Sequence, residues 1–229
     1  MTAISDPRSA AGRKALIFDL DGVLIDSEAL QYKAYSQVLA RFGVAVSMSE
    51  YAQHWIAAGR GPEYAVATYG LPVTAAELRA LKHPVYDEIL RGEITLMPGA
   101  AAAVTRLSAH FPLALATNSN RSDVDFVLDR FGLRSAFAAI VVREDYARAK
   151  PEPDAFLTAA ARLDMEPRSC VVIEDAYKGV LAAQRAGAHA IAVPNLFTRE
   201  NDFSLAAAVV GSLDEVTVPL VQSILSRSA

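Results

Sequence analysis

The chain of 229 residues has one cysteine, Cys170, so no disulfide can form within it. So sparing a use of cysteine is typical of a protein kept in a reducing compartment, and we expect this one to be cytoplasmic. Cys170 opens the apolar run Cys170–Ile173. We therefore expect its thiol to be a small buried group rather than a nucleophile.

Long apolar runs are also lacking. No stretch approaches the roughly 20 uninterrupted apolar residues that a membrane-spanning helix needs, so we expect no membrane association. Residues 1–12 are polar and have no apolar centre of the kind found in a signal peptide. We expect them to form a frayed tail.

The chain has no excess of positive charge. It contains 22 Lys and Arg against 26 Asp and Glu, a net charge of −4 at pH 7. A nucleic-acid-binding protein normally carries a basic stripe, and here Lys and Arg are scattered, so we expect no nucleic-acid partner. A glycine-rich phosphate loop is absent as well, which argues against nucleotide triphosphate chemistry of that type.

What the chain does have is a high apolar content, 52%, arranged in short continuous runs. Runs that are apolar throughout, rather than alternating, are typical of strands buried on both faces of a parallel sheet. Helical patterns separate the later runs, and this alternation predicts a doubly wound α/β sheet. The predicted strands are Ala15–Phe18, Leu113–Ala116, Ala139–Val142, Val171–Ile173, Ala190–Val193 and a weaker one near Ala208–Val210.

The first connection is far longer than the others. More than ninety residues without a convincing buried strand separate the first two runs, whereas a crossover needs only about a dozen. Helical patterns fill this gap. We therefore predict an inserted helical cap domain at residues 27–95, and an α/β core domain formed by residues 13–26 and 96–229.

Reactive side chains follow four of the predicted strands. In an open α/β sheet, ligands bind beyond the carboxyl ends of the strands, so these side chains are expected to converge. They are Asp19 and Asp21 after the first strand, Thr117, Asn118 and Ser119 after the second, Lys150 after the third, and Glu174 and Asp175 after the fourth.

Carboxylates gathered in one crevice raise one another's pKa values unless a cation lies among them. Oxygen ligands without a His or Cys cluster favour a hard ion, and we expect Mg²⁺ among the carboxylates of Asp19, Asp21, Glu174 and Asp175. Lys150 can neutralise a phosphoryl oxygen, to which Thr117 and Asn118 can donate hydrogen bonds. This inventory indicates phosphoryl transfer.

Each of these residues has an ordinary alternative. A lone Asp at a strand end usually caps a helix or faces solvent, and Thr117 or Ser119 alone would be an ordinary helix cap. Lys150 alone would be a surface charge. Their joint occurrence at successive strand ends is what favours a catalytic site.

These motifs resemble the haloacid dehalogenase superfamily of phosphatases, in the branch with a helical cap and a Rossmann-like core. The resemblance implies that Asp19 attacks phosphorus and forms an aspartyl-phosphate. It implies that Asp21 is the general acid and base, and that Thr117, Asn118 and Lys150 bind phosphate. The acid at Asp21 favours phosphate chemistry over dehalogenation, because the dehalogenases do not carry it.

Within that superfamily the chain is similar to β-phosphoglucomutase and to the sugar-phosphate and phosphoglycolate phosphatases. The mutases have a histidine where Gln31 stands, so we predict a phosphatase for a small phosphorylated metabolite such as a sugar phosphate. Two alternatives stay open: a phosphosugar mutase and a non-catalytic binding protein on the same fold. We expect a monomer or a dimer.

Specificity is expected to come from the cap, because the core reads only the phosphate. Gln31 is a candidate contact for a substrate hydroxyl, and its alternative is a solvent-facing helix position. Arg60, between Gly59 and Gly61, is a candidate for binding a second anionic group on the substrate. An exposed arginine in a connecting loop is the alternative.

Overall fold

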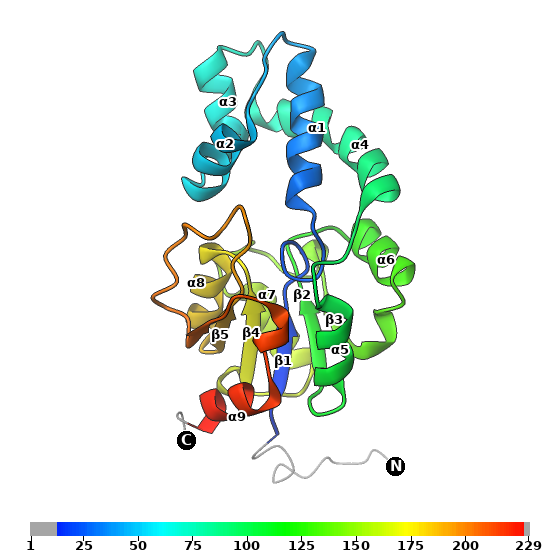
Figure 1. The fold of residues 1–229 in the computed structure, drawn as a ribbon, viewed down its shortest axis with the longest axis vertical. Helices are drawn as coiled ribbons and strands as arrows, with labels where there is room; N and C mark the ends of the chain where they lie inside the picture. The colour runs from blue at the N-terminus through cyan, green and yellow to red at the C-terminus, as the bar shows by residue number, and fades with distance from the viewer. Residues whose placement is uncertain (1–12, 227–229) are drawn as a thin grey trace.

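A parallel β-sheet forms the centre of the structure, a computed structural model that describes residues 13–226 (Figure 1). The strand order is β3-β2-β1-β4-β5-β6. With helices on both faces, this sheet confirms the predicted doubly wound α/β fold. The tail expected at residues 1–12 lies outside the described residues. The strands are β1 (Ala15–Phe18), β2 (Leu113–Ala116), β3 (Phe137–Val141), β4 (Cys170–Glu174), β5 (His189–Ala192) and β6 (Ala208–Val209).

Helices cover the two faces of the sheet because successive strand side chains point to opposite sides. In β1, Leu16 and Phe18 pack with apolar residues of α5, α6 and α9, whereas Ala15 and Ile17 pack with those of α7 and α8. The strand is therefore buried on both faces, as its continuous apolar run predicted. These helices are α5 (Ala100–Ser108), α6 (Arg121–Arg130), α7 (Asp154–Arg162), α8 (Tyr177–Ala186) and α9 (Val218–Ser226).

The long connection between β1 and β2 is helical, and it stands above the carboxyl ends of the strands (Figure 1). It has an apolar cluster of its own, built largely from its own aromatic and aliphatic side chains. We refer to it as the cap; the domain limits 27–95 stay a prediction. Its elements are α1 (Glu28–Ala40), α2 (Met48–Glu50), a π-helical segment (Tyr51–Ala57), α3 (Gly61–Tyr69) and α4 (Ala75–Glu93).

Several element limits differ from the sequence-based expectation. β3 begins at Phe137 rather than Ala139, and β5 begins at His189, because parallel pairing to a neighbouring strand extends each of them. Helix α9 was not anticipated; it buries Val221 and Ile224 against the sheet. Among the helices of residues 13–226, none combines the length and apolarity needed to cross a membrane.

Candidate active site

Asp19 lies at the carboxyl end of the central strand β1, and only 7% of it is exposed. Its backbone N–H donates to the Ile173 carbonyl at 2.9 Å. This bond ties the first loop, the one that follows β1, to β4. Because β1 is flanked by β2 and β4, Thr117, which follows β2, and Glu174, the last residue of β4, lie on either side of Asp19. The expected convergence of the strand ends is therefore present.

The loop after Asp19 needs a glycine at Gly22 for two reasons. Its φ of +76° is in the left-handed region, where a side chain is disfavoured. A Cβ atom at this position would also stand 2.4 Å from Asp175 Oδ2 and 2.7 Å from Asn195 Nδ2. The absence of a side chain lets the first loop lie directly against Asp175.

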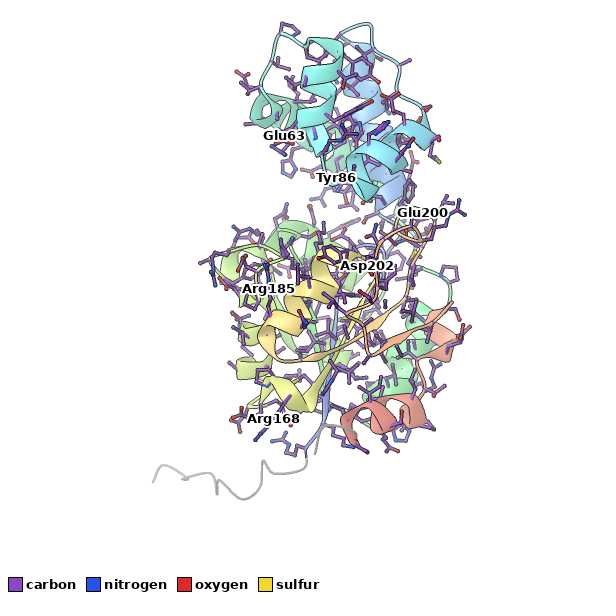
Figure 2. The ribbon with its side chains drawn as sticks, turned by 90° about the vertical axis from the view of Figure 1, so that its left-hand side faces the viewer. Glu63, Tyr86, Arg168, Arg185, Glu200 and Asp202 are labelled. Carbon is purple, nitrogen blue, oxygen red and sulfur yellow. The ribbon has the colours of Figure 1, made fainter. Side chains whose placement is uncertain are left out.

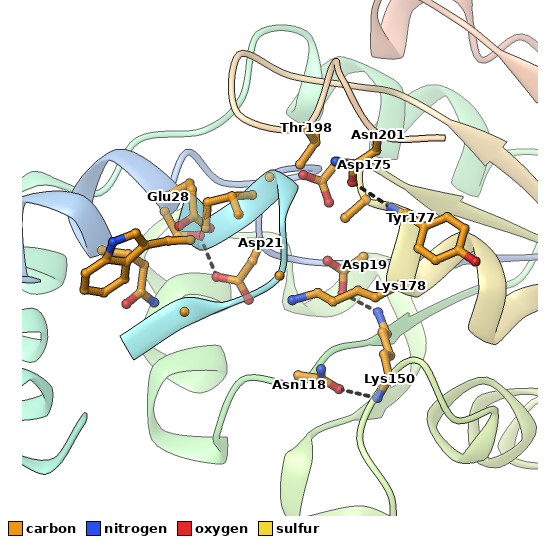
Figure 3. A pocket seen from close by; sticks show the side chains of 18 of the residues that line it. Asp19, Asp21, Glu28, Asn118, Lys150, Asp175, Tyr177, Lys178, Thr198 and Asn201 are labelled. Carbon is orange, nitrogen blue, oxygen red and sulfur yellow. Dashed lines mark hydrogen bonds and ion pairs between the residues drawn. The ribbon is translucent and has the colours of Figure 1, made fainter. Parts of the chain in front are cut away.

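Lys150 is the buried cation of the site. Its ammonium donates to Asp19 Oδ1 at 2.6 Å (Figure 3). It also donates to Glu174 Oε1 at 2.8 Å and to the Ala116 carbonyl at 3.0 Å. Burial alone would lower the pKa of Lys150, but the Asp19 and Glu174 carboxylates outweigh it and raise that pKa above its usual range. Lys150 is thus a fixed positive charge beside Asp19.

Three buried carboxyl groups meet here, since Asp19, Glu174 and Asp175 each offer an oxygen within 4.8 Å of the others. Burial raises the pKa of Asp19 to about 7 against the attraction of Lys150, and Glu174 and Asp21 add to the rise. Burial, followed by repulsion from Glu174 and Asp19, also raises the pKa of Asp175 well above its usual range. One lysine does not offset this much negative charge, and an all-oxygen donor set of this kind fits a hard divalent cation such as Mg²⁺.

Glu174 holds this cluster in place. One of its oxygens accepts from Lys150, and the other accepts from the backbone N–H groups of Asp175 and Ala176 at 3.0 and 3.2 Å. The carboxylate also lies against Gly179 of α8, where a Cβ atom would stand 1.8 Å from Glu174 Cδ. The helix can pass this close only because position 179 has no side chain.

Replacing Gly179 with alanine is therefore expected to destabilise the fold. The added methyl group forces Glu174 or α8 to shift, and such overpacking costs about 1–3 kcal/mol of unfolding free energy. Gly92, within α4, is the matched control, because a Cβ atom there meets nothing within 4 Å. Gly92→Ala should add roughly 0.5–1 kcal/mol through helix propensity. Urea denaturation of both variants checks this, and equal responses would contradict the close packing at Gly179.

Asp21 lies nearer the opening of the site. Its Oδ1 accepts from the Ser27 hydroxyl at 2.6 Å, while its Oδ2 accepts from the Ser119 hydroxyl and from Thr117 Oγ1 at 3.3 Å. The carboxylate is thereby fixed between the first loop, the start of the cap and the loop after β2. The roles of Ser27 and Ser119 in holding Asp21 were not predicted, although Ser119 is among the residues identified after the second strand.

Asn118 is held from behind by Tyr146. The phenol contacts Asn118 Oδ1 at 2.7 Å and the Thr117 carbonyl at 2.8 Å, and the Lys150 backbone N–H donates to the same Asn118 oxygen at 3.2 Å. These bonds join the loops that follow β2 and β3. Tyr146 carries no motif signal, and the sequence analysis did not identify it.

A cavity of about 850 Å³ opens between this cluster and the cap. Its lining includes Asp19, Asp21, Thr117, Asn118, Lys150, Glu174 and Asp175, so the predicted core residues all face it (Figure 3). The cap contributes Glu63 to the lining, and the loop after β5 contributes Glu200 and Asp202 from below (Figure 2). The cavity is thus shared between the core and the cap.

The two cap candidates differ in position. Gln31 lines the cavity, and its side-chain oxygen accepts from the Lys82 ammonium. Arg60 is not among the lining side chains, although Gly59 and Gly61 are. The Arg60 guanidinium instead donates to His54 Nδ1 at 2.7 Å and lies 4.8 Å over the Tyr64 ring, and these contacts hold it away from the cavity.

Trp55 and Glu28 are two further cap residues of the cavity wall. Within the described residues, the Trp55 indole Nε1 is buried without a hydrogen-bond partner. Glu28 also lines the cavity and accepts from the Tyr51 hydroxyl at 2.5 Å. A buried donor without a partner is uncommon.

The α/β sheet, the helical insertion after β1 and the carboxylate–lysine cluster together define a hydrolase-type catalytic core. A family model for haloacid dehalogenase-like hydrolases matches residues 13–187. The chain belongs to that family.

Similar proteins of assigned activity include hexitol phosphatase A of Escherichia coli, 36% identical over 90% of this chain and 94% of that protein. The bifunctional riboflavin kinase/FMN phosphatase of Arabidopsis thaliana is 31% identical over 88% of this chain, which spans only 54% of that longer protein. Among solved structures, a CbbY variant from Rhodobacter sphaeroides in complex with xylulose-(1,5)bisphosphate superposes with a TM-score of 0.73. It is 28% identical, and the match covers 89% of this chain and 96% of that one.

Proposed function

We propose that this protein is a Mg²⁺-dependent phosphatase that hydrolyses a small phosphate monoester through an aspartyl-phosphate on Asp19. The observation that carries the proposal is the pairing of Asp19 with the buried Lys150, beside the separately held carboxylate of Asp21. This arrangement supports Asp19 as the attacking group and Asp21 as the group that exchanges a proton. The phosphatase relatives support the same reaction class.

The reaction takes two displacements at phosphorus. In the first, an Asp19 oxygen forms a bond to phosphorus while the bond to the leaving oxygen breaks, and Asp21 gives that oxygen its proton. In the second, Asp21 takes a proton from water, whose oxygen attacks phosphorus, and the Asp19–phosphorus bond breaks to release inorganic phosphate. Lys150, Thr117 and the loop at Asn118 stabilise the phosphoryl oxygens.

Mg²⁺ would be held by Asp19, Asp175 and the backbone carbonyl of Asp21, with Glu174 in support. When bound, the ion neutralises charge on the phosphoryl oxygens. Both oxygens of Glu174 already accept hydrogen bonds, so its part is to keep Asp175 and Lys150 in position.

The leaving group is proposed to be a polyhydroxylated carbon chain, as in a sugar or hexitol phosphate. Glu28 and Gln31 line the cap side of the cavity with side chains that can form hydrogen bonds to hydroxyl groups. Hexitol phosphatase A and the bisphosphate complex of CbbY are relatives whose named ligands are of this kind.

A phosphate-release screen in Mg²⁺ tests the proposal, with hexitol phosphates, sugar phosphates, phosphoglycolate and FMN as substrates. Release of inorganic phosphate from a hexitol or sugar monophosphate is the expected result. Formation of a sugar phosphate isomer that requires a bisphosphate activator would instead identify a mutase. No turnover of any monoester would reject the proposal.

Removing the metal is expected to stop turnover. In excess chelator no cation neutralises the charge on the phosphoryl oxygens beside this acidic cluster, so the rate should fall by at least about 10²-fold and return when Mg²⁺ is added. The measurement is the initial rate of phosphate release against free Mg²⁺ concentration. Rates that stay undiminished in chelator would count against the metal site.

A further inference from the structure

The loop between β5 and β6 supplies one side chain to the apolar core of the cap. Phe197 of this loop is 6% exposed, and its ring meets the Tyr51 ring edge-on, with centroids 6.3 Å apart and planes at 90°. The other buried members of that cap cluster come from residues 35–78. A residue from the sheet side of the molecule therefore completes the core of the cap.

Asn195 builds the turn that presents Phe197. Its side-chain oxygen accepts from the Phe197 backbone N–H at 2.9 Å. Its own backbone N–H donates to Thr198 Oγ1 at 3.1 Å, and its carbonyl accepts from the Thr198 N–H at 3.2 Å. The position of the Phe197 ring thus depends on the Asn195 side chain.

The nitrogen of the same Asn195 side-chain amide reaches the group of buried carboxylates beside Asp19. Asn195 Nδ2 donates to Asp175 Oδ2 at 2.8 Å and to the Gly22 carbonyl at 3.3 Å. Asp175 is 7% exposed and is one of the three carboxylates grouped as a cation site. One side chain therefore contacts both the turn carrying Phe197 and a carboxylate of the cation site.

We propose that Asn195 and Phe197 form a latch that couples docking of the cap to the orientation of Asp175. With the Phe197 ring buried beside Tyr51, the turn is fixed and Asn195 holds the Asp175 carboxylate. When the ring leaves the cap, the turn loses that support and so does Asp175. Such coupling is reciprocal: a cation at Asp175 favours the docked cap by the same factor by which docking favours the cation. The latch rests on the proposed function only in taking Mg²⁺ as the cation.

Titration calorimetry of Mg²⁺ into metal-free protein tests the latch. Phe197→Ala removes the cap contact and touches no carboxylate, yet it should raise the Kd for Mg²⁺ about fivefold or more. Phe197→Tyr keeps the ring and should restore the wild-type Kd. Leu196→Ala, at a 61% exposed position in the same turn, is the matched control and should leave the Kd unchanged. A wild-type Kd in Phe197→Ala would overturn the coupling.

Amide hydrogen exchange at residues 51–56 tests the same link in the other direction. Asn195→Ala and Phe197→Ala should both speed exchange at these residues, while Leu196→Ala should not. Unchanged exchange in Asn195→Ala would overturn the latch. Neither measurement needs a substrate, so a failed phosphatase screen leaves this test intact. If the wild-type protein binds no Mg²⁺, the metal assignment fails, and the exchange result alone decides the latch.

Discussion

Asp19→Asn is expected to abolish phosphate release, with a loss on the order of 10⁴-fold or more, because the amide cannot form the bond to phosphorus. Lys150, Asp21, Thr117 and Asn118 would all remain in this variant. The test is single-turnover and steady-state phosphate release from the best substrate of the screen. Appreciable residual turnover would remove Asp19 from the role of nucleophile.

The loss in Asp19→Asn must be separated from misfolding. Burial raises the pKa of Asp19 to about 7, so in the absence of metal the folded protein is disfavoured when this group ionises. A neutral amide of the same shape removes that cost, while Lys150 keeps its bonds to Glu174 and Ala116. The midpoint of thermal unfolding in chelator is therefore not expected to fall, and a large fall would make the activity result uninformative about the nucleophile.

Lys150→Met is expected to lower both stability and activity. The substitution leaves the Asp19 and Glu174 carboxylates buried without their counter-ion, and breaking a buried pair in this way costs about 3–5 kcal/mol. Phosphate release should fall by at least about 10²-fold, since one fixed charge on the phosphoryl oxygens is lost. Urea denaturation in chelator at pH 8, together with the release assay, measures the two effects.

The pH dependence of that stability loss has a definite sign. Lys150 lowers the pKa of Asp19, so without it this carboxyl binds a proton more readily. Protonation removes the unpaired charge, and the deficit in Lys150→Met should therefore shrink between pH 8 and pH 6. Lys33→Met is the control: Lys33 is exposed on α1 and pairs with the exposed Glu93, so its loss should change the unfolding free energy by less than about 1 kcal/mol. Equal losses for the two lysines would contradict the buried pairing.

The core of the site was predictable because two simple rules act together. Strands β1, β2 and β4 are buried on both faces, so each is a continuous apolar run, and ligands gather where parallel strands end. Asp19 and Thr117 follow such runs directly, so the sequence alone predicts that they lie side by side. Lys150 follows β3 only after several residues, so its place beside Asp19 also depends on the path of the loop after β3.

The residues missed by the sequence analysis lack a local signal. Asn195 and Phe197 stand in a loop without periodicity, and their partners Asp175 and Tyr51 are distant in the chain. In the sequence, Gly179 is an ordinary glycine within a predicted helix, and only the structure shows that the Glu174 carboxylate packs against it. Arg60 was expected to bind a second anionic group of the substrate. It does not line the cavity, because contacts with His54 and Tyr64 hold its guanidinium away from it. Such contacts depend on tertiary structure, which propensity and pattern do not encode.

The central place of β1 in the sheet bears on how the protein is made. Leu16 pairs with Leu113 on one side and with Val171 on the other, so the strand made first finds its neighbours only after long stretches have been synthesised. Contacts between residues so far apart slow folding, because a large loop must close before they can form. A nascent chain that has emerged only as far as the cap helices therefore has Asp19 but no site around it. Catalytic competence arrives late, when β4 joins the sheet and brings Glu174 and Asp175 with it.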